Sequence, residues 1–468
     1  MPDMTSQPPS STMSLRPHQQ EFVNQAVNSP AVPNRFLLSA PPGAGKTVTL
    51  AALAKTLKEK RGSLRCLCIA PAQLVPQWQE QLSNFGGLEA VAMNPPTYRR
   101  LQAESGAGVN VWKTVPSAVA SIDFLKMLGR MAEVLEAGWD LVLLDEAHLS
   151  TDSSQRGDVA EDVWDSLSVK LAVATTQLLN EPAWLAHNPR TTNVQWKLSD
   201  LLASREKTQR HVHNVFYTPT EAERQILSRV NQLVGLANKD SQSQFVARLL
   251  SRRLSSSLYA FEQTLRQLLT NEILAVVDLP DWTQDDAEDE ADDPVHKNPL
   301  NIDRNAGEQI IGLLEAEPQD SKWECCFQLL NRLGIGTAIS GIIFTDYADT
   351  AEYLSFLAKN RGLNIVLITG TTSYEERRSG LDKARETKSL LIATGAVEGV
   401  NYSCTNQIIH YDIPRNPRTL EQRIGRVERV GNQFHIFDHY YILNDESAAD
   451  KVLTELMVKM QAIEQAWK

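Results

Sequence analysis

Four residues near the start of the chain have the types and spacing of a phosphate-binding loop. In the stretch LLSAPPGAGKTVTLAAL, Gly43, Gly45, Lys46 and Thr47 lie between an apolar run and a helix-like one. Glycines let backbone N–H groups close around phosphate oxygens, and the N-terminus of the following helix adds partial positive charge. Lys46 is expected to reach the outer phosphates, and the Thr47 hydroxyl to bind Mg²⁺. Ala40 replaces the first glycine of the usual pattern, at a position that tolerates other residues.

An acidic pair follows the apolar run of WDLVLLDEAHLS. Asp145, at the tip of this predicted strand, can hold Mg²⁺ directly or through water, and Glu146 can orient and deprotonate an attacking water. Phosphoryl transfer needs this division of labour because positioning and charge neutralisation supply most of its catalysis. A purely structural acidic pair fits less well, because the pair follows the phosphate loop at the separation expected for such sites. The two motifs together predict binding and hydrolysis of ATP with Mg²⁺.

The stretch EQRIGRVERVG supplies cations near the end of the chain. Read as a helix, it places Gln422, Arg426 and Arg429 on one face. Gly425 lies beside them and would let the helix approach a neighbouring backbone, although glycine costs a helix about 1 kcal/mol relative to alanine. Such a face can simply lie at the protein surface, where the arginines contact water and pair with nearby glutamates. If two lobes of the chain face each other, it instead offers arginine fingers to a γ-phosphate bound at Lys46.

A parallel sheet with crossover helices is the expected support for these groups. From residue 35 to about 180, apolar runs such as RFLLSA and LRCLCIAP alternate with polar, helix-like stretches, which is typical of that architecture. Residues 205 to 275 instead read as long amphipathic helices. The acidic run DLPDWTQDDAEDEADDPVHKNP reads as a solvated linker, with a nucleic-acid mimic that blocks a groove as the alternative. From about residue 320 the alternation returns with GIIFTDY, NIVLITG and SLLIATG.

The predicted fold class is therefore α/β, with two lobes and a helical insertion between them. A chain of 468 residues is too long for a single core, which agrees with several domains. The expected segments are a disordered tail (1–14), a first lobe (15–204), the helical insertion (205–278), the acidic linker (279–300) and a second lobe (301–468).

Composition narrows the class of protein. A formal net charge of −11 argues against nonspecific coating of nucleic acid or membrane, while leaving room for a local basic groove. The 5 cysteines show no zinc-site or CxxC spacing, which fits free thiols in a reducing cytoplasm. No apolar run reaches the roughly eighteen residues of a membrane span, and the first residues lack the order of a signal peptide. We therefore predict a cytoplasmic protein with no membrane partner.

The ordered motifs resemble superfamily 2 helicases and translocases of the DEAH-lettered kind, and more narrowly their Swi/Snf-like branch, which includes bacterial RapA-type ATPases. LRPHQ, IAPAQLVPQWQEQL, SIDFLK and WDLVLLDEAH match in the first lobe, and IIFTDYADTAEYL, LLIATGAVEGVNY and YDIPRNPRTLEQRIGRVERVG in the second. RLLSRRLSSSLYAFEQTL resembles the helical insertion of the RapA-like group. The resemblance covers residues 15 to about 445. It implies two RecA-like lobes, ATP and Mg²⁺ as ligands, and nucleic acid, with duplex DNA favoured over RNA, as the track.

The resemblance also implies roles for individual residues. Nucleotide binding is expected from Gln19, Gly43, Ala44, Gly45, Lys46, Thr47, Glu398, Gly399 and Gln422. Catalysis is expected from Lys46, Asp145, Glu146, Arg426 and Arg429, with Thr47 and Asp145 as the metal ligands. Contacts to the nucleic-acid backbone are expected from Pro71, Ser121, Thr345, Gly370 and Thr394. Small hydroxyls and backbone amides suit that last role because they contact phosphates without reading bases.

One motif departs from the family pattern. The motif that couples hydrolysis to movement usually reads T-G-T-P-x-x-N, whereas this chain has ATTQLLN at 174–180. Thr176 and Asn180 match that pattern, but Gln177 stands where proline is expected. Hydrolysis is therefore predicted more securely than its coupling to movement.

Three functional hypotheses remain open on the sequence. The leading one is an ATP-driven translocase on double-stranded nucleic acid, with DNA favoured. A strand-separating DNA or RNA helicase has the same motor core. A nucleotide-sensing clamp subunit with weak or no motor activity would explain the altered coupling motif. We find no nuclease, methyltransferase or zinc motif in the sequence, so we expect a protein partner that supplies an effector activity in a DNA-processing or defence complex.

Overall fold

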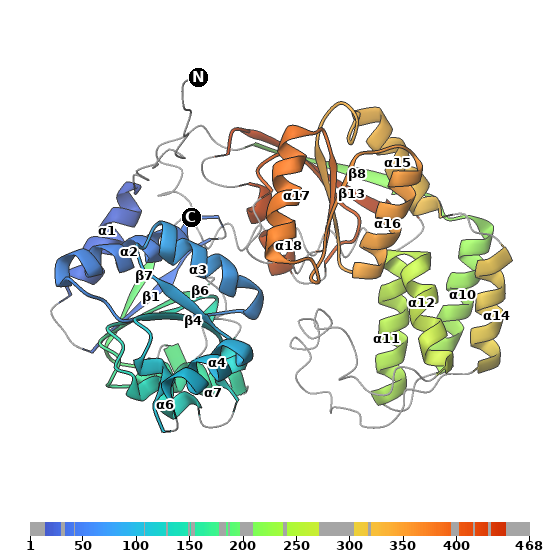
Figure 1. Cartoon of the computed structure of the whole chain (residues 1–468). Coiled ribbons are helices and arrows are strands. Elements are labelled where there is room, and N and C mark those ends of the chain that lie inside the picture. Colours follow the sequence, from blue (N-terminus) through green and yellow to red (C-terminus); the bar gives the residue numbers. More distant parts are fainter. Residues whose placement is uncertain are drawn as a thin grey trace, which may run out of the picture. The chain divides into compact units, whose positions relative to one another are not determined.

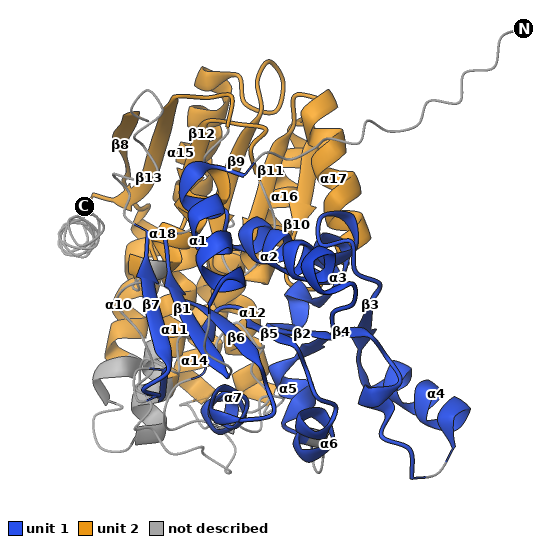
Figure 2. Ribbon diagram, turned by 90° about the vertical axis from the view of Figure 1, so that its left-hand side faces the viewer, with its two compact units in different colours: residues 1–205, 463–468 blue, residues 206–462 orange. Residues whose placement is uncertain are grey.

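The computed structural model contains two compact units, which are described separately (Figure 2). Unit 1 comprises Met1–Arg205 with Ile463–Lys468, and unit 2 comprises Glu206–Ala462. The structure describes residues 15–29, 33–41, 43–106, 108–127, 130–147, 150, 155–176, 184–185, 188–196, 209–236, 241–270, 304–316, 320–394, 402–414, 417–428 and 432–445. The predicted tail (1–14) and acidic linker (279–300) lie outside these ranges. Within them, no helix is long and apolar enough to cross a membrane.

Unit 1 is built on a seven-stranded parallel sheet of order β3-β4-β2-β5-β6-β1-β7. The strands are β1 (Asn34–Ser39), β2 (Cys66–Ala70), β3 (Ala90–Met93), β4 (Ser117–Ser121), β5 (Leu141–Leu144), β6 (Leu171–Thr176) and β7 (Thr191–Gln195). The helices of this unit are α1 (Pro17–Val27), α2 (Lys46–Arg61), α3 (Val75–Asn84), α4 (Pro95–Ser105), α5 (Ile122–Leu125), α6 (Arg130–Glu136) and α7 (Gln155–Asp165). Figure 1 shows them around the sheet. All parallel strands end at one edge, which is where binding sites form in such folds.

The core of unit 1 occupies both faces of its sheet. Leu37 packs in one buried cluster with Val142, and the next residue, Leu38, packs in the other with Leu143. Successive side chains of a strand point to opposite faces, so a strand covered on both sides must be apolar at every position. This explains why central strands such as β2 and β5 were visible in the sequence as unbroken apolar runs, whereas the edge strand β7, with the sequence TTNVQ, was not.

Unit 2 contains a six-stranded parallel sheet of order β10-β11-β9-β12-β13-β8. The strands are β8 (Gln209–Tyr217), β9 (Gly341–Thr345), β10 (Ile365–Ile368), β11 (Leu390–Thr394), β12 (Gln407–His410) and β13 (Ile436–Asn444). The accompanying helices are α15 (Ser321–Leu333), α16 (Ala348–Asn360), α17 (Tyr374–Glu386) and α18 (Pro417–Val427). Two α/β lobes with parallel sheets confirm the fold class predicted from the sequence.

A helical layer forms the rest of unit 2. It consists of α10 (Glu221–Leu236), α11 (Ser241–Ser256), α12 (Leu258–Thr270) and α14 (Arg304–Ala316), which lie side by side in Figure 1. Their buried faces share a separate apolar cluster that includes Val230, Leu250, Phe261 and Ile310. The predicted helices of the insertion are therefore present.

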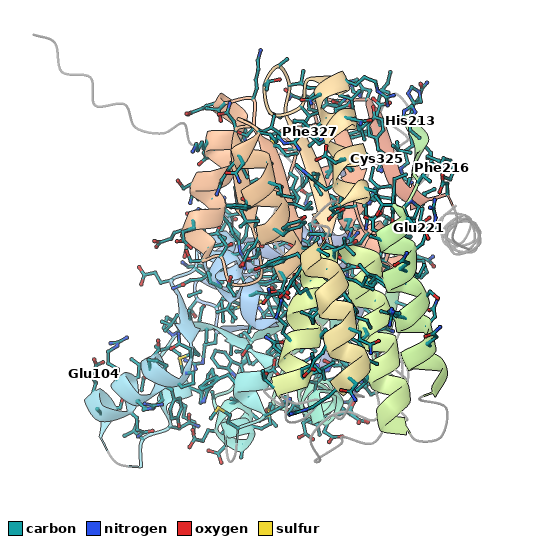
Figure 3. The ribbon with its side chains drawn as sticks, turned by 90° about the vertical axis from the view of Figure 1, so that its right-hand side faces the viewer. Glu104, His213, Phe216, Glu221, Cys325 and Phe327 are labelled. Carbon is teal, nitrogen blue, oxygen red and sulfur yellow. The ribbon has the colours of Figure 1, made fainter. Side chains whose placement is uncertain are left out.

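Two boundaries of the predicted insertion need correction. We expected helices from residue 205 and the second lobe from residue 301, but β8 joins the second sheet beside β13, and α14 packs with α10 and α12. Strand β8 is an edge strand, exposed at most positions, so its sequence QRHVHNVFY carries little apolar alternation. Figure 3 shows its His213 and Phe216 near Cys325 and Phe327 of α15. Helix α14 belongs to the helical layer because that layer buries its Ile310.

Candidate functional site

The phosphate loop connects β1 to α2 at the edge where the parallel strands end. Gly43 and Gly45 have φ angles of 77° and 86°, in the left-handed region that favours glycine. Gly45 is also the N-cap residue of α2, so the chain enters the helix directly from this turn. A side chain at Gly45 would be strained and crowded, because a Cβ there would lie 2.6 Å from Nε2 of Gln19.

Lys46 and Gln19 are held against this loop. The Lys46 side chain is buried, and its Nζ donates to the carbonyl oxygen of Ala40 at 2.9 Å. Gln19 Nε2 donates to the carbonyl oxygen of Gly45 at 3.3 Å, while Gln19 Oε1 accepts from the backbone N–H of Arg16 at 3.0 Å. The structure thus brings Gln19, predicted to read adenine, next to the residues predicted to hold phosphates. Thr47, predicted to bind the metal, is partly exposed on the first turn of α2.

Asp145 follows β5 and accepts two side-chain hydrogen bonds. The indole Nε1 of Trp78 donates to Oδ2 at 2.7 Å, and the hydroxyl of Thr175 donates to Oδ1 at 2.7 Å. Burial, together with the neighbouring charge of Glu146, raises the pKa of Asp145, against the opposing effects of these two bonds and of Lys46. A cation bound beside the carboxylate would therefore stabilise its ionised form. The carboxylate is fixed in orientation before any ligand arrives.

Glu146 adopts a strained backbone conformation beside Asp145. Its φ of 51° makes it the one non-glycine residue with positive φ among those that the structure describes. Such conformations cost about 1–3 kcal/mol and persist where the surroundings hold them, often at functional sites. Here the backbone N–H of Glu146 donates to the Thr175 hydroxyl at 3.2 Å. One threonine therefore contacts both members of the acidic pair.

Trp78 and Thr175 were not among the site residues predicted from the sequence. Trp78 belongs to the PQW stretch that we matched to the family, and Thr175 belongs to the altered coupling motif ATTQLLN. Both lay in recognised motifs, but nothing in the sequence linked either side chain to Asp145. The side chain of Thr176, and all of Gln177 and Asn180, lie outside the described part of the chain.

In unit 2, the predicted arginine face lies on α18. Gln422 and Arg426 are partly exposed there. Arg423 is buried instead, where its Nη1 donates to the carbonyl oxygen of Asp412 at 2.9 Å and its Nη2 pairs with Asp346. Arg423 therefore has a structural role. Glu398, Gly399 and Arg429, also predicted at the nucleotide, lie outside the described residues.

The two nucleic-acid candidates of unit 1 lie next to each other. Ser121 ends β4 and pairs in register with Ala70, and Pro71 follows directly after β2. Both are partly exposed. The Ser121 hydroxyl accepts a hydrogen bond from the backbone N–H of Phe124 at 3.1 Å, so it caps the short helix α5. The sheet edge therefore presents both residues together.

The candidates of unit 2 do not all suit contact with a track. Gly370 is exposed, and its carbonyl oxygen accepts from Nη2 of Arg377 at 3.0 Å. Thr394 is 5% exposed, and Thr345 is fully buried. The Thr345 hydroxyl donates to the buried carboxylate of Asp412, so in this structure the Thr345 side chain is not available for the predicted contact to a nucleic-acid backbone. Burial of a residue at the end of a central strand was not visible in the motif.

Two protein-family models match separate parts of the chain. Residues 12–178 match the res subunit of type III restriction enzymes, and residues 321–431 match the helicase conserved C-terminal domain. These ranges contain the phosphate loop and acidic pair of unit 1 and helix α18 of unit 2.

Curated relatives match over most of the chain. It is 25% identical to the uncharacterized ATP-dependent helicase YqhH of Bacillus subtilis, over 94% of this chain and 77% of that protein. It is 24% identical to the RNA polymerase-associated protein RapA of Vibrio campbellii, over 93% of this chain and 48% of that protein. The chain thus spans about half the length of RapA.

Among solved structures, the helicase domain of Hef from Pyrococcus furiosus has a similar fold. The TM-score is 0.51 at 14% identity, and the match covers 94% of this chain and 98% of that one. At this identity the match supports the fold alone, which agrees with two RecA-like lobes.

Proposed function

Because this chain belongs to the superfamily 2 helicases, in their Swi/Snf-like branch, we propose that it is an ATP-driven translocase that moves along double-stranded DNA. The chain is an ATPase of the helicase and translocase class, whose members act on nucleic acid. The observation that carries the proposal is the oriented Asp145–Glu146 pair beside Lys46 and the glycine loop. The choice of duplex DNA rests on the likeness to RapA-type proteins.

Each residue of the unit 1 site has a separate task in this proposal. The backbone N–H groups from Gly43 to Thr47 cradle the phosphates, and Lys46 exchanges its bond to the Ala40 carbonyl for a phosphate oxygen. Glu146 orients and deprotonates the attacking water. Gln19 holds the adenine edge while it remains joined to Gly45.

The residues present also fit Mg²⁺. Thr47 and Asp145 offer a hydroxyl and a carboxylate oxygen, the donors that Mg²⁺ prefers, and the ion commonly keeps several waters. Trp78 and Thr175 orient the carboxylate from behind, as outer partners of metal ligands do. When bound, the ion neutralises charge on the phosphate oxygens.

The second lobe is proposed to complete the site and to grip the track. Arg426 and Arg429 would stabilise charge in the transition state, with Gln422, Glu398 and Gly399 around the nucleotide. The proposed contacts to phosphates of the track are Pro71, Ser121, Gly370 and Thr394. Thr345 is left out because its hydroxyl is buried.

Thr175 offers a physical route for coupling despite the altered motif. It belongs to ATTQLLN and contacts both Asp145 and the backbone of Glu146. A change in the acidic pair during hydrolysis would therefore reach this motif through two hydrogen bonds.

One set of assays separates the candidate functions. The ATPase rate is measured with single-stranded DNA, duplex DNA and RNA, and at increasing salt. We expect stimulation by duplex DNA, independent of its sequence and weakened by salt, because backbone contacts depend on counterion release. We also expect displacement of a triplex-forming strand without unwinding of a forked duplex.

Other results would change the assignment. Robust fork unwinding would favour a strand-separating helicase, and stimulation by RNA alone would exclude DNA as the track. A protein that binds ATP but responds to no nucleic acid would be a clamp. We further propose a protein partner that supplies an effector activity, since the RapA relatives are named for association with RNA polymerase and extend well beyond the matched region. Copurification from the native host, followed by identification of bound proteins, tests this.

A further inference from the structure

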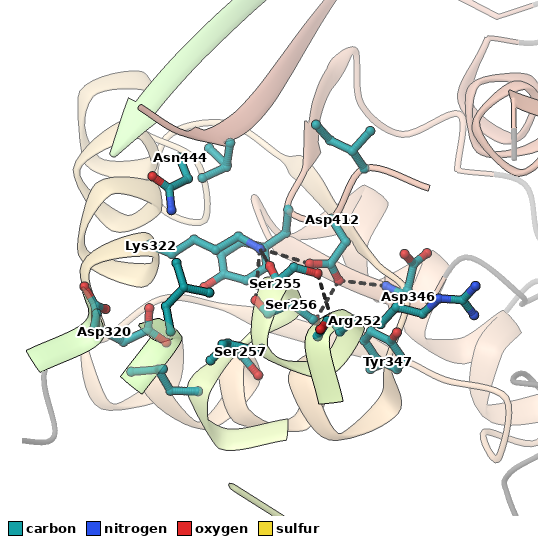
Figure 4. Close-up of a pocket in the computed structure, with 18 of the residues that line it drawn as sticks. Arg252, Ser255, Ser256, Ser257, Asp320, Lys322, Asp346, Tyr347, Asp412 and Asn444 are labelled. Carbon is teal, nitrogen blue, oxygen red and sulfur yellow. Dashed lines mark hydrogen bonds and ion pairs between the residues drawn. The ribbon is translucent and has the colours of Figure 1, made fainter. Parts of the chain in front are cut away.

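A cavity of about 380 Å³ lies within unit 2, where the helical layer meets the second sheet (Figure 4). Its walls come from α10, α11, the start of α15 and the segment 411–414 that leads to α18. The volume is within the range of small-molecule sites. The nucleotide residues of unit 1 contribute nothing to it, so the cavity is a separate candidate site.

Among the charged side chains that line this cavity, carboxylates outnumber cations. The four acidic side chains are Glu223, Asp320, Asp346 and Asp412, and the two basic ones are Arg252 and Lys322. Two of the acids already have charge partners, because Lys322 Nζ lies 3.0 Å from Asp412 Oδ1 and Arg423 pairs with Asp346. Once these ion pairs are set aside, Glu223 and Asp320 give the cavity an acidic end.

Asp320 and Glu223 are close enough to influence each other. The Asp320 carboxyl is buried, accepts from the backbone N–H of Trp323 at 2.8 Å, and caps helix α15. Burial raises the pKa of Asp320 to about 6, and the charge of Glu223 adds to this effect, while the charge of Lys322 and the hydrogen bonds from Trp323 and Tyr353 oppose it. Glu223 is held in place by the backbone N–H of Ser321 at 2.9 Å and by the Ser321 hydroxyl. A cation at this end would relieve the repulsion between the two carboxyl groups.

Tyr411 gives a second, independent sign of a ligand. Its side chain is fully buried and lines the cavity, yet its hydroxyl has no hydrogen-bond partner among the residues that the structure describes. A buried hydroxyl without a partner costs about 1–3 kcal/mol, so such groups usually meet a ligand or water. Apolar side chains complete the lining, including Leu227, Val230 and Leu254. The cavity therefore offers an acidic end, a spare hydroxyl and an apolar wall.

We propose that this cavity binds a small organic cation, an ammonium or guanidinium group on an aliphatic body. The charged head lies at Asp320 and Glu223, the Tyr411 hydroxyl accepts from it, and the aliphatic body packs on Leu227 and Val230. The source of this chemistry is a free amine or the basic side chain of a partner protein. The proposal goes beyond the translocase function and does not depend on it.

The position of the cavity makes such a ligand a candidate regulator of the motor. Asp412, Ile413 and Pro414 line it and lead directly into α18, which carries Arg426. Next to Asp412, Ser255 and Ser256 of the helical layer accept from Lys322 Nζ through their carbonyl oxygens, at 2.7 and 2.9 Å, and the Ser256 hydroxyl donates to Asp412 Oδ2 at 2.9 Å. Figure 4 shows Lys322 between these serines and Asp412. A ligand would therefore contact both the helical layer and the support of α18.

Binding is tested on the full chain by calorimetry and by the shift of the unfolding temperature. The probes are agmatine and n-butylammonium, with butyrate and n-butanol as anionic and neutral controls. Asp320→Asn removes the charge but keeps a capping side chain, and Tyr411→Phe removes only the hydroxyl that lacks a partner. Glu386→Gln, at an exposed position of α17, is the matched control for loss of one negative charge.

We expect the two amines to bind and to stabilise the wild-type chain and Glu386→Gln. Binding should fall at least tenfold in Asp320→Asn and several-fold in Tyr411→Phe. Wild-type affinity should rise about tenfold from pH 5 to pH 7.5, because the cation favours ionised Asp320, whose free pKa is about 6. The titratable groups that interact electrostatically with the Asp320 carboxyl are those of Tyr217, Glu223, Lys322, Cys326, Tyr353 and Tyr411.

Three outcomes would overturn the proposal. In the first, neither amine binds to the wild-type chain. In the second, butyrate or butanol binds as tightly as the amines. In the third, Tyr411→Phe binds the amines as tightly as wild type and the affinity does not depend on pH. Tyr411→Phe keeps the test valid if Asp320→Asn fails to fold. A short peptide with one arginine that binds more tightly than agmatine would support the same chemistry and identify a partner protein as its source. All these readouts are independent of ATPase activity.

Discussion

Removal of the Thr175 hydroxyl tests the central feature of the candidate active site. Thr175 is fully buried, donates to Asp145 Oδ1 at 2.7 Å, and accepts from the backbone N–H of Glu146 at 3.2 Å. Thr175→Val keeps the branched shape and removes both bonds. A hydrogen bond to a charged group contributes about 1.5–3 kcal/mol and an ordinary one about 0.5–1.5 kcal/mol. We therefore expect a loss of about 2–4 kcal/mol in the free energy of unfolding of unit 1.

The kinetic effect should be larger on turnover than on ATP binding. The acidic pair loses its fixed orientation, and misplacement of catalytic groups by about 1 Å can cost 10²-fold in rate. The phosphate loop keeps its own contacts, including the bond from Lys46 to Ala40. We expect kcat with duplex DNA to fall about 10²-fold, with little change in KM for ATP.

A matched control distinguishes this effect from general loss of a buried hydroxyl. Thr264 in α12 is 2% exposed and donates to the carbonyl oxygen of Ala260 at 3.0 Å. Thr264→Val should lose some stability and keep the wild-type kcat. If Thr175→Val keeps kcat within about twofold of wild type while Asp145→Ala is inactive, Thr175 does not orient the acidic pair.

Three further predictions concern the proposed chemistry and the stability of unit 2. Lys46→Ala should weaken ATP binding and abolish turnover, whereas Glu146→Gln should bind ATP normally and lose turnover; near-normal hydrolysis by Glu146→Gln would exclude it as the base. Arg426→Ala and Arg429→Ala should each lose about 3 kcal/mol or more of transition-state stabilisation, and lysine at either position should not restore activity. If an alanine variant keeps more than about a tenth of the wild-type ATPase rate, that arginine is not an arginine finger. Burial would raise the pKa of Asp412, but the charge of Lys322 and the hydrogen-bond donors around the carboxylate outweigh it and hold the pKa below its ordinary value. Ionised Asp412 therefore stabilises the folded chain fully above about pH 4, and this stabilisation is lost as the pH falls through the lower pKa of the folded state. Acid unfolding followed by circular dichroism should show a weaker pH dependence in Asp412→Asn, and an unchanged pH profile would contradict this role.

Sequence alone was sufficient for features that depend on neighbouring residues. Gly43, Gly45 and Lys46 are close in the chain, so the turn, the helix start and the phosphate-binding chemistry follow from local conformation and residue type. Central strands of both sheets, such as β2, β5, β9 and β11, were visible because a strand covered on both faces is apolar nearly throughout. Those local signals predicted the α/β class and the ATPase class, and both predictions are confirmed.

Only the tertiary structure decided features that join distant residues or depend on burial. Trp78 and Asp145 are 67 positions apart, and Thr175 and Asp145 are 30 apart, so no local pattern reveals their hydrogen bonds. The edge strand β8 has too few buried side chains to show an apolar alternation, yet it pairs with β13 along its length. Thr345 matches a motif for contact with nucleic acid, but the fold buries it against Asp412. Residue type sets what a side chain can do, while packing between distant segments decides which partner it meets.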